Sequence, residues 1–299
     1  MNYRELPNIT LKQKEIMDLV FRFRFINRKQ IQRLLNHKDP KRINAWLKDL
    51  VDKKYLSRIY SHKLLENTKP AIYFLNNNGI LWARYEKGQE YRADDWQLDI
   101  KYLKKFYQDK HASQTFINHC IALSEFYTQF KEYERSINKD KKKEVIEYSF
   151  QTKTEMWIDK QLHLQKGEDF NEIKQSIPDL FFEKILKPYS KNIKSQTFFL
   201  ELFDPHMPRW AIKYRIKQYI KYKEEDNDWK LYSGLDNKFP IILLIFPHQQ
   251  KINAVSKFIN DELLYSYDSD DMKFLVTTYQ KAMAETLIGK QNIWKEIRG

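Results

Sequence analysis

Two acidic residues stand where neighbouring strands would present a pair of carboxylates. Asp179 follows Pro178 at the start of one expected strand, and Glu201 lies near the carboxyl end of the next. Paired strands bring such side chains within reach of a shared cation. Two carboxylates are the minimum protein contribution to a Mg²⁺ site that activates water against a phosphodiester. Glu125, on a helix expected before these strands, is a candidate third ligand.

The spacing of the two carboxylates resembles the restriction-endonuclease-like core, in which Pro-Asp is followed one hairpin later by Glu or Asp, any residue, and Lys. This sequence departs from that pattern, because Phe203 stands where the resemblance places the lysine. Lys213 or Lys217 of the following helix would have to orient the attacking water instead. Three interpretations stay open: carboxylates with a structural role, a metal site without efficient cleavage, and an active nuclease. The missing lysine favours a protein without turnover.

A second set of residues has the chemistry of DNA recognition. Winding residues 40–53 at 3.6 per turn places polar and small side chains opposite an apolar stripe. Lys, Arg and Asn side chains reach base edges or phosphates in a major groove, and the small Ala45 permits close approach. The candidate DNA contacts are Lys38, Lys41, Arg42, Asn44, Lys48, Arg58 and Lys63. The alternative is the solvated charged face of any small helical domain.

Three short helices and two strands must position that face. Thr10, Asn27 and Asp39 each precede apolar residues at helical spacing, which predicts a helix after each. The helices are too short to be stable alone, so they share a core in a helix-turn-helix arrangement. Residues 55–60 and 71–76 then predict two strands joined by a basic loop, which together form a wing. The wing cations expected near phosphates are Arg58, His62, Lys63 and Lys69.

Positive charge is concentrated at the amino terminus. Residues 1–64 hold 16 Lys or Arg and 6 Asp or Glu, so they carry a net +10 of the formal +13 of the chain. A solvated face would ordinarily mix both signs. The asymmetry therefore favours a nucleic-acid binder, whose affinity comes largely from displacing counterions from phosphates.

The expected fold class is α+β, with an N-terminal winged helix-turn-helix domain at 1–87, a linker at 88–109 and a nuclease-like α/β domain at 110–299. A helix that packs back on the first domain is the alternative to the linker, because residues such as Trp96, Leu98 and Phe106 are available to bury. In the second domain the pattern predicts a long helix and then a mixed sheet in an α/β sandwich. The expected elements are helices at 112–135, 208–224 and 249–264, and strands at 144–151, 178–186, 196–203, 239–246 and 274–278.

The composition excludes several classes of protein. With 42% hydrophobic residues in 299 the chain has enough apolar material for cores. The one cysteine, Cys120, excludes an internal disulfide and a cysteine-based zinc site. No signal peptide is expected, and the longest apolar run, 239–247, is about half of a bilayer span. We expect a soluble cytoplasmic protein without a membrane partner.

Residues 208–222 interleave basic and aromatic side chains. Such a helix suits a nucleic-acid backbone, because ammonium groups meet phosphates and rings can stack. The alternative is an ordinary amphipathic helix, since Ile212, Ile216, Tyr219 and Ile220 fit a core stripe whose wet side carries the lysines.

The chain resembles the replication-relaxation family of bacterial plasmid and mobile-element proteins. The segments that carry the resemblance, in order, are LKQKEIMDLVFRFRFINRKQIQRLL, YLSRIY, YFLNNNG, FINHCIALSEFY, IPDLFFE and TFFLELFDPHMPRWAIKYRIKQY. The resemblance implies a winged helix fused to a nuclease-like fold and a role in plasmid replication, DNA relaxation or mobilisation. It also implies an acidic residue two positions after Glu201, where this chain has Phe203 and places Asp204 one position later.

The leading hypothesis is a double-stranded DNA-binding protein of a plasmid or mobile element that acts without turnover. Its expected partners are duplex DNA, replication or mobilisation proteins and a second copy of the chain in a homodimer. One alternative is a Mg²⁺-dependent nicking endonuclease that uses Asp179 and Glu201. The other is a winged-helix transcriptional repressor. No cofactor other than Mg²⁺ is expected.

Overall fold

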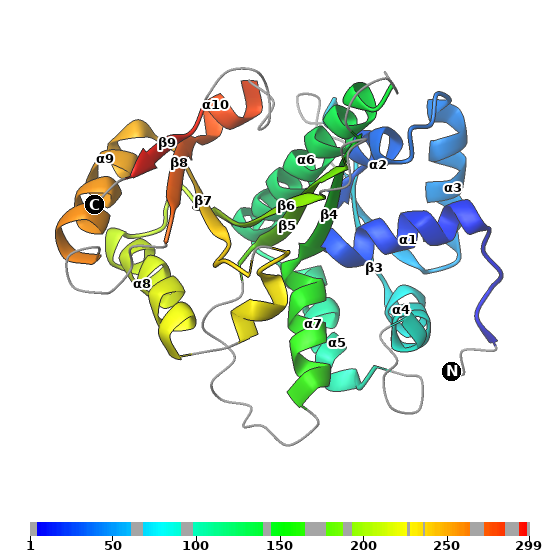
Figure 1. Ribbon diagram of the computed structural model, residues 1–299. Coiled ribbons are helices and arrows are strands. Elements are labelled where there is room, and N and C mark those ends of the chain that lie inside the picture. The colour runs from blue at the N-terminus through cyan, green and yellow to red at the C-terminus, as the bar shows by residue number, and fades with distance from the viewer. Residues whose placement is uncertain are drawn as a thin grey trace. The chain divides into compact units, whose positions relative to one another are not determined.

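The chain forms two compact units in a computed structural model, whose elements are shown in Figure 1. The first unit comprises residues 1–128 and 154–168, and the second comprises residues 129–153 and 169–299. The structure describes residues 5–60, 68–90, 98–139, 145–164, 178–187, 193–225, 228–235, 237–263, 272–284 and 293–297. Within these residues no helix is both long and apolar enough to span a membrane.

The first unit begins with the three helices that the sequence predicts. Its elements are α1 (Leu11–Phe23), β1 (Ile26–Asn27), α2 (Arg28–Leu34), α3 (Pro40–Asp52), β2 (Leu56–Ile59), β3 (Ile72–Leu75), α4 (Asn77–Glu90), α5 (Ile100–Gln108), most of α6 (Gln114–Ile137) and α7 (Lys153–Leu164). The strands form an antiparallel sheet in the order β1-β3-β2. The short β1 joins α1 to α2 and lies against β3 on the side opposite β2.

Each predicted helix start is confirmed by a side-chain cap. The Thr10 and Asn27 side chains accept from the backbone N–H of Gln13 and Gln30, and both glutamines bond back to the cap residue. These reciprocal pairs satisfy donors that a helix start otherwise leaves open. Asp39 accepts from the backbone N–H of Lys41 at 2.8 Å, and a proline holds the first position of α3.

The segment predicted as a linker contains α5 instead. Leu98, Leu103 and Phe106 are buried, and the Phe106 ring stacks on Phe21 of α1 with centroids 5.2 Å apart. The alternative stated above, a helix that packs back on the first unit, therefore describes this segment. The free energy gained by burying three apolar side chains exceeds the cost of ordering the polar residues around them.

A six-stranded mixed sheet forms the second unit. Its strands lie in sequence order: β4 (Val145–Thr152), β5 (Leu180–Lys187), β6 (Lys194–Leu202), β7 (Ile241–Phe246), β8 (Phe274–Thr278) and β9 (Lys295–Ile297). The pairs β6-β7 and β7-β8 are parallel, and the other neighbours are antiparallel. The mixed sheet expected from the sequence is confirmed, with β9 as an additional edge strand.

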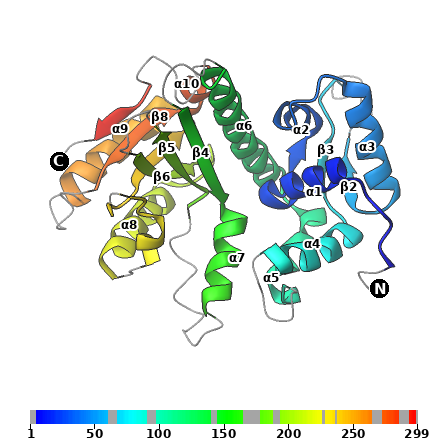
Figure 2. The same cartoon turned by 45° about the vertical axis from the view of Figure 1, so that its right-hand side comes forward.

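Helices cover both faces of this sheet (Figure 2). The parallel strands are connected by α8 (Arg209–Glu225) and α9 (Gln249–Phe258, continued by a π-helical turn Ile259–Leu263), and right-handed crossovers place both helices on one face. On the other face Phe130 of α6 packs against Phe182 of β5, with ring centroids 4.8 Å apart. The short α10 (Tyr279–Ala284) contacts α6 there through Met283 and Gln129.

Candidate nucleic-acid interface

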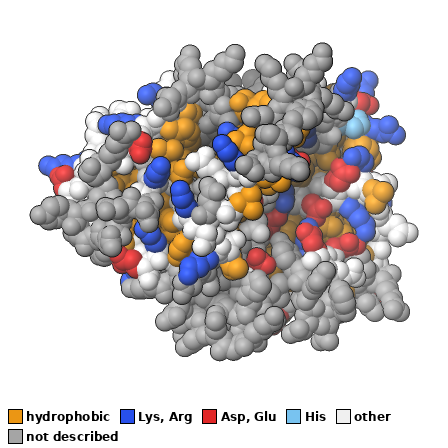
Figure 3. All heavy atoms as spheres, viewed as in Figure 1, with side chains coloured by type: hydrophobic (Ala, Val, Ile, Leu, Met, Phe, Trp, Pro, Cys, Tyr) orange, Lys and Arg blue, Asp and Glu red, His pale blue; other side chains and the backbone are white. Residues whose placement is uncertain are grey.

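The face of α3 that the sequence predicts to be exposed is exposed. Lys41, Asn44, Ala45 and Lys48 lie on the surface, whereas Ile43, Leu47 and Leu50 are completely buried. Lys38 and Arg42 are exposed as well. Figure 3 shows several Lys and Arg side chains on the surface of the first unit where α3 begins. The helix thus presents cations and an amide around one small residue.

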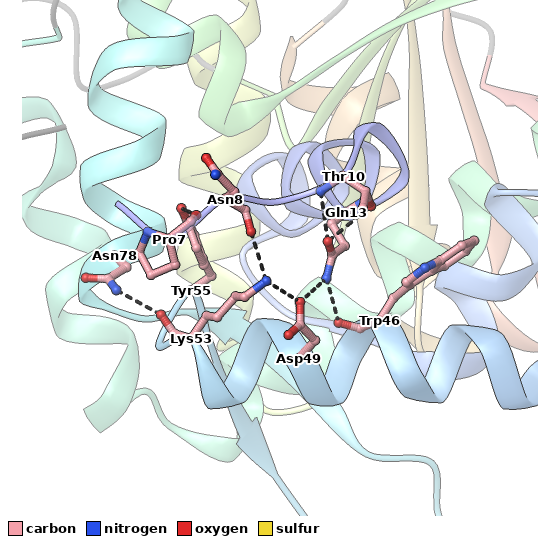
Figure 4. Close-up of polar contacts among 9 residues, drawn as sticks. All are labelled: Pro7, Asn8, Thr10, Gln13, Trp46, Asp49, Lys53, Tyr55 and Asn78. Atoms are coloured by element: carbon pink, nitrogen blue, oxygen red, sulfur yellow. Dashed lines mark hydrogen bonds and ion pairs between the residues drawn. The ribbon is translucent and has the colours of Figure 1, made fainter. Parts of the chain in front are cut away.

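Hydrogen bonds fix α3 against α1 (Figure 4). Gln13 of α1 donates to Asp49 Oδ2 at 2.6 Å and to the carbonyl of Trp46 at 3.5 Å. Lys53 donates to the same Asp49 oxygen at 2.8 Å and to the carbonyl of Asn8 at 2.8 Å. The hydrogen bond from Lys53 lowers the pKa of Asp49, and that from Gln13 adds to the effect. These contacts set the rotation of α3 and thereby which residues face outward.

The turn after α3 is held on two sides. Tyr55 donates its hydroxyl proton to the carbonyl of Pro7 at 2.5 Å, and the Asn78 side chain donates to the carbonyl of Lys53 at 2.8 Å (Figure 4). Gly79 of α4 lies so close that a Cβ added there would come within 2.2 Å of the Tyr55 carbonyl oxygen. The backbone leaving α3 is therefore pressed directly against α4.

A basic cavity opens beside the exposed face of α3. It measures about 580 Å³ and is bounded by the start of α2, the outer side of α3 and strands β2 and β3. The cations that line it are Arg28, Lys29, Lys48, Arg58 and Lys69. Among its described lining residues the one acidic side chain is Asp52. A concave surface with this charge balance concentrates anions, and phosphates in particular.

Tyr73 provides a buried hydroxyl in this cavity. Burial raises the pKa of Tyr73, while the charges of Arg58 and Arg28 lower it. Two guanidinium groups from different elements therefore converge on one hydroxyl group. Such an arrangement provides several N–H donors and an O–H donor to a phosphate oxygen.

The other expected DNA contacts are distributed differently. Arg58 lies in the cavity lining, as does Lys69, whereas His62 and Lys63 fall outside the described residues. Sequence reasoning did not identify Arg28 and Lys29, which occupy the first turn of α2. The sequence feature that could have identified them is the Arg-Lys pair directly after the Asn27 cap. The first turn of α2 lines the same basic cavity as the outer side of α3.

Asp179 and Glu201 lie side by side in the second unit, as predicted. Leu180 pairs with Leu200 in the antiparallel register, which places the two carboxylates on adjacent strand ends. Glu201 Oε1 accepts from Arg215 Nη2 at 2.5 Å and from the Tyr219 hydroxyl at 2.5 Å. Asp179 accepts from the backbone N–H of Leu202 at 3.0 Å and from Lys153 Nζ at 3.3 Å.

Burial governs the electrostatics of this carboxylate pair. It raises the pKa of Glu201, the charge of Asp179 raises it further, and Arg215 opposes both. The cations Arg215 and Lys153 supply the positive charge that a metal ion would supply in a nuclease. A Mg²⁺ ion needs several open oxygen ligands, so the pair as it stands does not fit one.

The remaining candidates for catalysis have partners of their own. Lys213 pairs with Glu262 at 2.9 Å on the surface, and Glu125 accepts from Arg33 of α2 at 2.5 Å in the first unit. Phe203 is buried and stacks on Phe246 with centroids 4.8 Å apart, while Asp204 accepts from the backbone N–H of His206 at 2.8 Å. Among the described residues no three His, Cys, Asp or Glu side chains form a group that could hold a metal. Lys213 and Glu125 are therefore each engaged in an ion pair, with Glu262 and Arg33 respectively.

The comparisons with known proteins give one match. The model of a family described as replication-relaxation matches residues 17–237. The match begins within α1 and includes α2, α3, the residues of the basic cavity, both carboxylates and α8. No similar curated protein and no similar solved structure was found.

Proposed function

Because this chain belongs to the replication-relaxation family, we propose that it acts in the replication or relaxation of a plasmid or mobile element by binding double-stranded DNA through its first unit. The observation that carries the proposal is the basic cavity beside α3. Five cations from α2, α3, β2 and the segment before β3 line it against one described acidic residue. The exposed Lys41 and Arg42 extend the same charge to the start of α3.

In this proposal the first unit is a winged helix-turn-helix. The order α1-β1-α2-α3-β2-β3 with an antiparallel sheet supports it. The recognition helix would be α3, with Asn44 and Lys48 toward base edges and Ala45 permitting close approach. Arg28, Arg58 and Lys69 would contact the phosphates on either side, which positions the helix without reading sequence.

In this proposal the second unit does not catalyse DNA cleavage. Its two carboxylates are bonded by Arg215, Tyr219 and Lys153, and Phe203 in the place of the expected lysine belongs to the core. A supercoiled plasmid incubated with the protein and Mg²⁺ or Mn²⁺ is therefore expected to stay intact. Nicking that disappears in D179A would overturn this part of the proposal and establish the nicking nuclease.

The DNA-binding proposal is tested by a titration of plasmid DNA fragments with K41A/K48A. The double variant is expected to bind more weakly, and the slope of log affinity against log salt should fall by about one unit per lost phosphate contact. Lys12 offers a matched control, because it is an exposed lysine of the same unit that pairs with Glu15 at 2.7 Å. K12A should leave the affinity and the slope unchanged. Equal affinity of K41A/K48A and the wild type would reject the proposal.

Selection of bound fragments from the host plasmid tests the process. Fragments from a replication origin or a transfer region support the proposed role. A binding site confined to the promoter of the protein's own gene, with no effect of the protein on copy number or transfer, would contradict this role. It would indicate a transcriptional repressor instead.

A further inference from the structure

Helix α8 exposes two large aromatic rings. Trp210 is 72% exposed and Tyr214 is 52% exposed. The two positions are four residues apart, so their side chains are neighbours on one helix face. Side chains of this size usually bury most of their surface, and exposed rings in a group commonly mark a binding surface.

Cations continue the same face. Lys217 and Lys221 are exposed and follow Tyr214 at intervals of three and four residues, while Arg209 is exposed beside Trp210. The opposite side of the helix carries Ile212, Ile216, Tyr219 and Ile220, all buried against the sheet. The aromatic rings therefore belong to the wet side of α8 and not to its core stripe. We call Arg209, Trp210, Tyr214, Lys217 and Lys221 the α8 face.

The α8 face carries three exposed cations, Arg209, Lys217 and Lys221. Lys213 lies at its edge and is paired with Glu262 of the π-helical turn. Lys217 is exposed, and its ammonium nitrogen lies 5.7 Å from the centroid of the Phe258 ring of α9. Glu224, at the end of the helix, is one turn beyond the last of these lysines. Lys and Arg side chains are visible over the part of the molecule that α8 and α9 form (Figure 3).

We propose that the α8 face binds single-stranded nucleic acid. Unpaired bases would stack on Trp210 and Tyr214, and Arg209, Lys217 and Lys221 would contact the phosphates between them. Charge alone would suit any polyanion. The rings select the single strand, because the face of a base is open to a side chain only when the base has left the duplex stack. The proposal goes beyond duplex binding by the first unit and uses none of its residues.

The test is a titration of the full chain with a fluorescently labelled oligothymidine. W210A/Y214A is expected to bind it at least about tenfold more weakly than the wild type, since each lost stacking partner weakens binding by this order. W210F/Y214F keeps both rings and should retain most of the affinity. L231A is the matched control, because Leu231 is also a large exposed apolar side chain, at 69%, outside the α8 face. Unfolding midpoints of all variants should agree, since the substituted side chains are exposed.

A labelled duplex separates this inference from the proposed function. K41A/K48A should lose duplex affinity and keep oligothymidine affinity, and W210A/Y214A should do the reverse. Oligothymidine affinity that is unchanged in W210A/Y214A overturns the inference, and so does a loss that L231A shares. Self-association that W210A/Y214A abolishes, without any oligothymidine binding by the wild type, would instead assign the face to a second copy of the chain.

Discussion

Arg215 of α8 and Glu201 of β6 form a buried ion pair in which one guanidinium nitrogen lies 2.5 Å from Oε1 of the carboxylate. The same oxygen accepts the hydroxyl proton of Tyr219, which follows Arg215 by four residues, about one turn of α8. The pair joins the helix layer to the middle of the sheet. Removing one partner of such a pair leaves a buried charge without compensation.

R215M should therefore destabilise the second unit strongly. The expected loss in the free energy of unfolding is about 3–5 kcal/mol, because Glu201 keeps its burial and loses its cation. Denaturant unfolding measures it. K213M is the matched control, since Lys213 and Glu262 have 41% and 53% of their side-chain surface exposed and such pairs contribute at most about 1 kcal/mol. Similar losses in both variants would contradict the structural role of Arg215.

Q13A should loosen the contact between α1 and α3. The substitution removes half of the Thr10 capping box and the hydrogen bonds to Asp49 and Trp46. An expected cost of about 1–3 kcal/mol follows, because the buried Gln13 loses its half of the capping box and its hydrogen bond to a charged carboxylate. Thermal unfolding of Q13A beside K12A, which changes an exposed neighbour, measures this. An unfolding midpoint of Q13A no lower than that of K12A would show that the Gln13 hydrogen bonds do not stabilise the contact between α1 and α3.

G79A should impair folding of the first unit. The added methyl group would meet the Tyr55 carbonyl oxygen at 2.2 Å, and a backbone atom cannot move aside as a flexible side chain does. We expect a loss of at least about 1–3 kcal/mol in the free energy of unfolding. N77A changes an exposed residue in the first turn of the same helix and should have a much smaller effect. Equal stability of G79A and N77A would mean that α4 shifts freely.

Asp109 should give stability an unusual pH dependence. Burial raises the pKa of Asp109 to about 6, against the opposing hydrogen bonds and charge of Arg24. Between the unfolded value of 3.8 and about 6 the folded state therefore binds more protons than the unfolded state. The contribution of Asp109 is fully present below pH 4 and is lost as pH rises through 6. The free energy of unfolding of the wild type minus that of D109N should accordingly fall between pH 4 and 7. A difference that rises over this range would refute it.

Local signals in the sequence predict the first unit well. The caps Thr10, Asn27 and Asp39 are short-range features, and the stripe of Ile43, Leu47 and Leu50 faces the core as its spacing predicts. The missed elements depend on distant partners. Strand β9 has three residues and forms through pairing with β8, and three apolar residues of α7, Met156, Trp157 and Ile158, are consecutive and give no helical period.

The carboxylate pair was also predictable only in part. Its position follows from strand register, which the alternation of apolar residues predicts. Its cations do not follow, because Lys153 is contributed from 26 residues before Asp179. Arg215 and Lys213 each stand next to a residue of the core stripe of α8, Ile216 and Ile212, so the spacing alone does not show that Arg215 bonds to Glu201 whereas Lys213 pairs with Glu262 at the surface.

Gln13 and Gln30 each belong to the capping box at the start of a helix, and each also bonds to another helix. Gln13 donates to Asp49 and to the Trp46 carbonyl, and Gln30 donates to the Ile121 carbonyl at 2.9 Å. An uncharged amide is the donor in every one of these contacts, and dissolved ions screen such contacts far less than they screen a phosphate contact. Rising ionic strength should therefore detach a bound duplex while the frame that aims α3 keeps its geometry. The unit would be ready to rebind at once on dilution, without a refolding step.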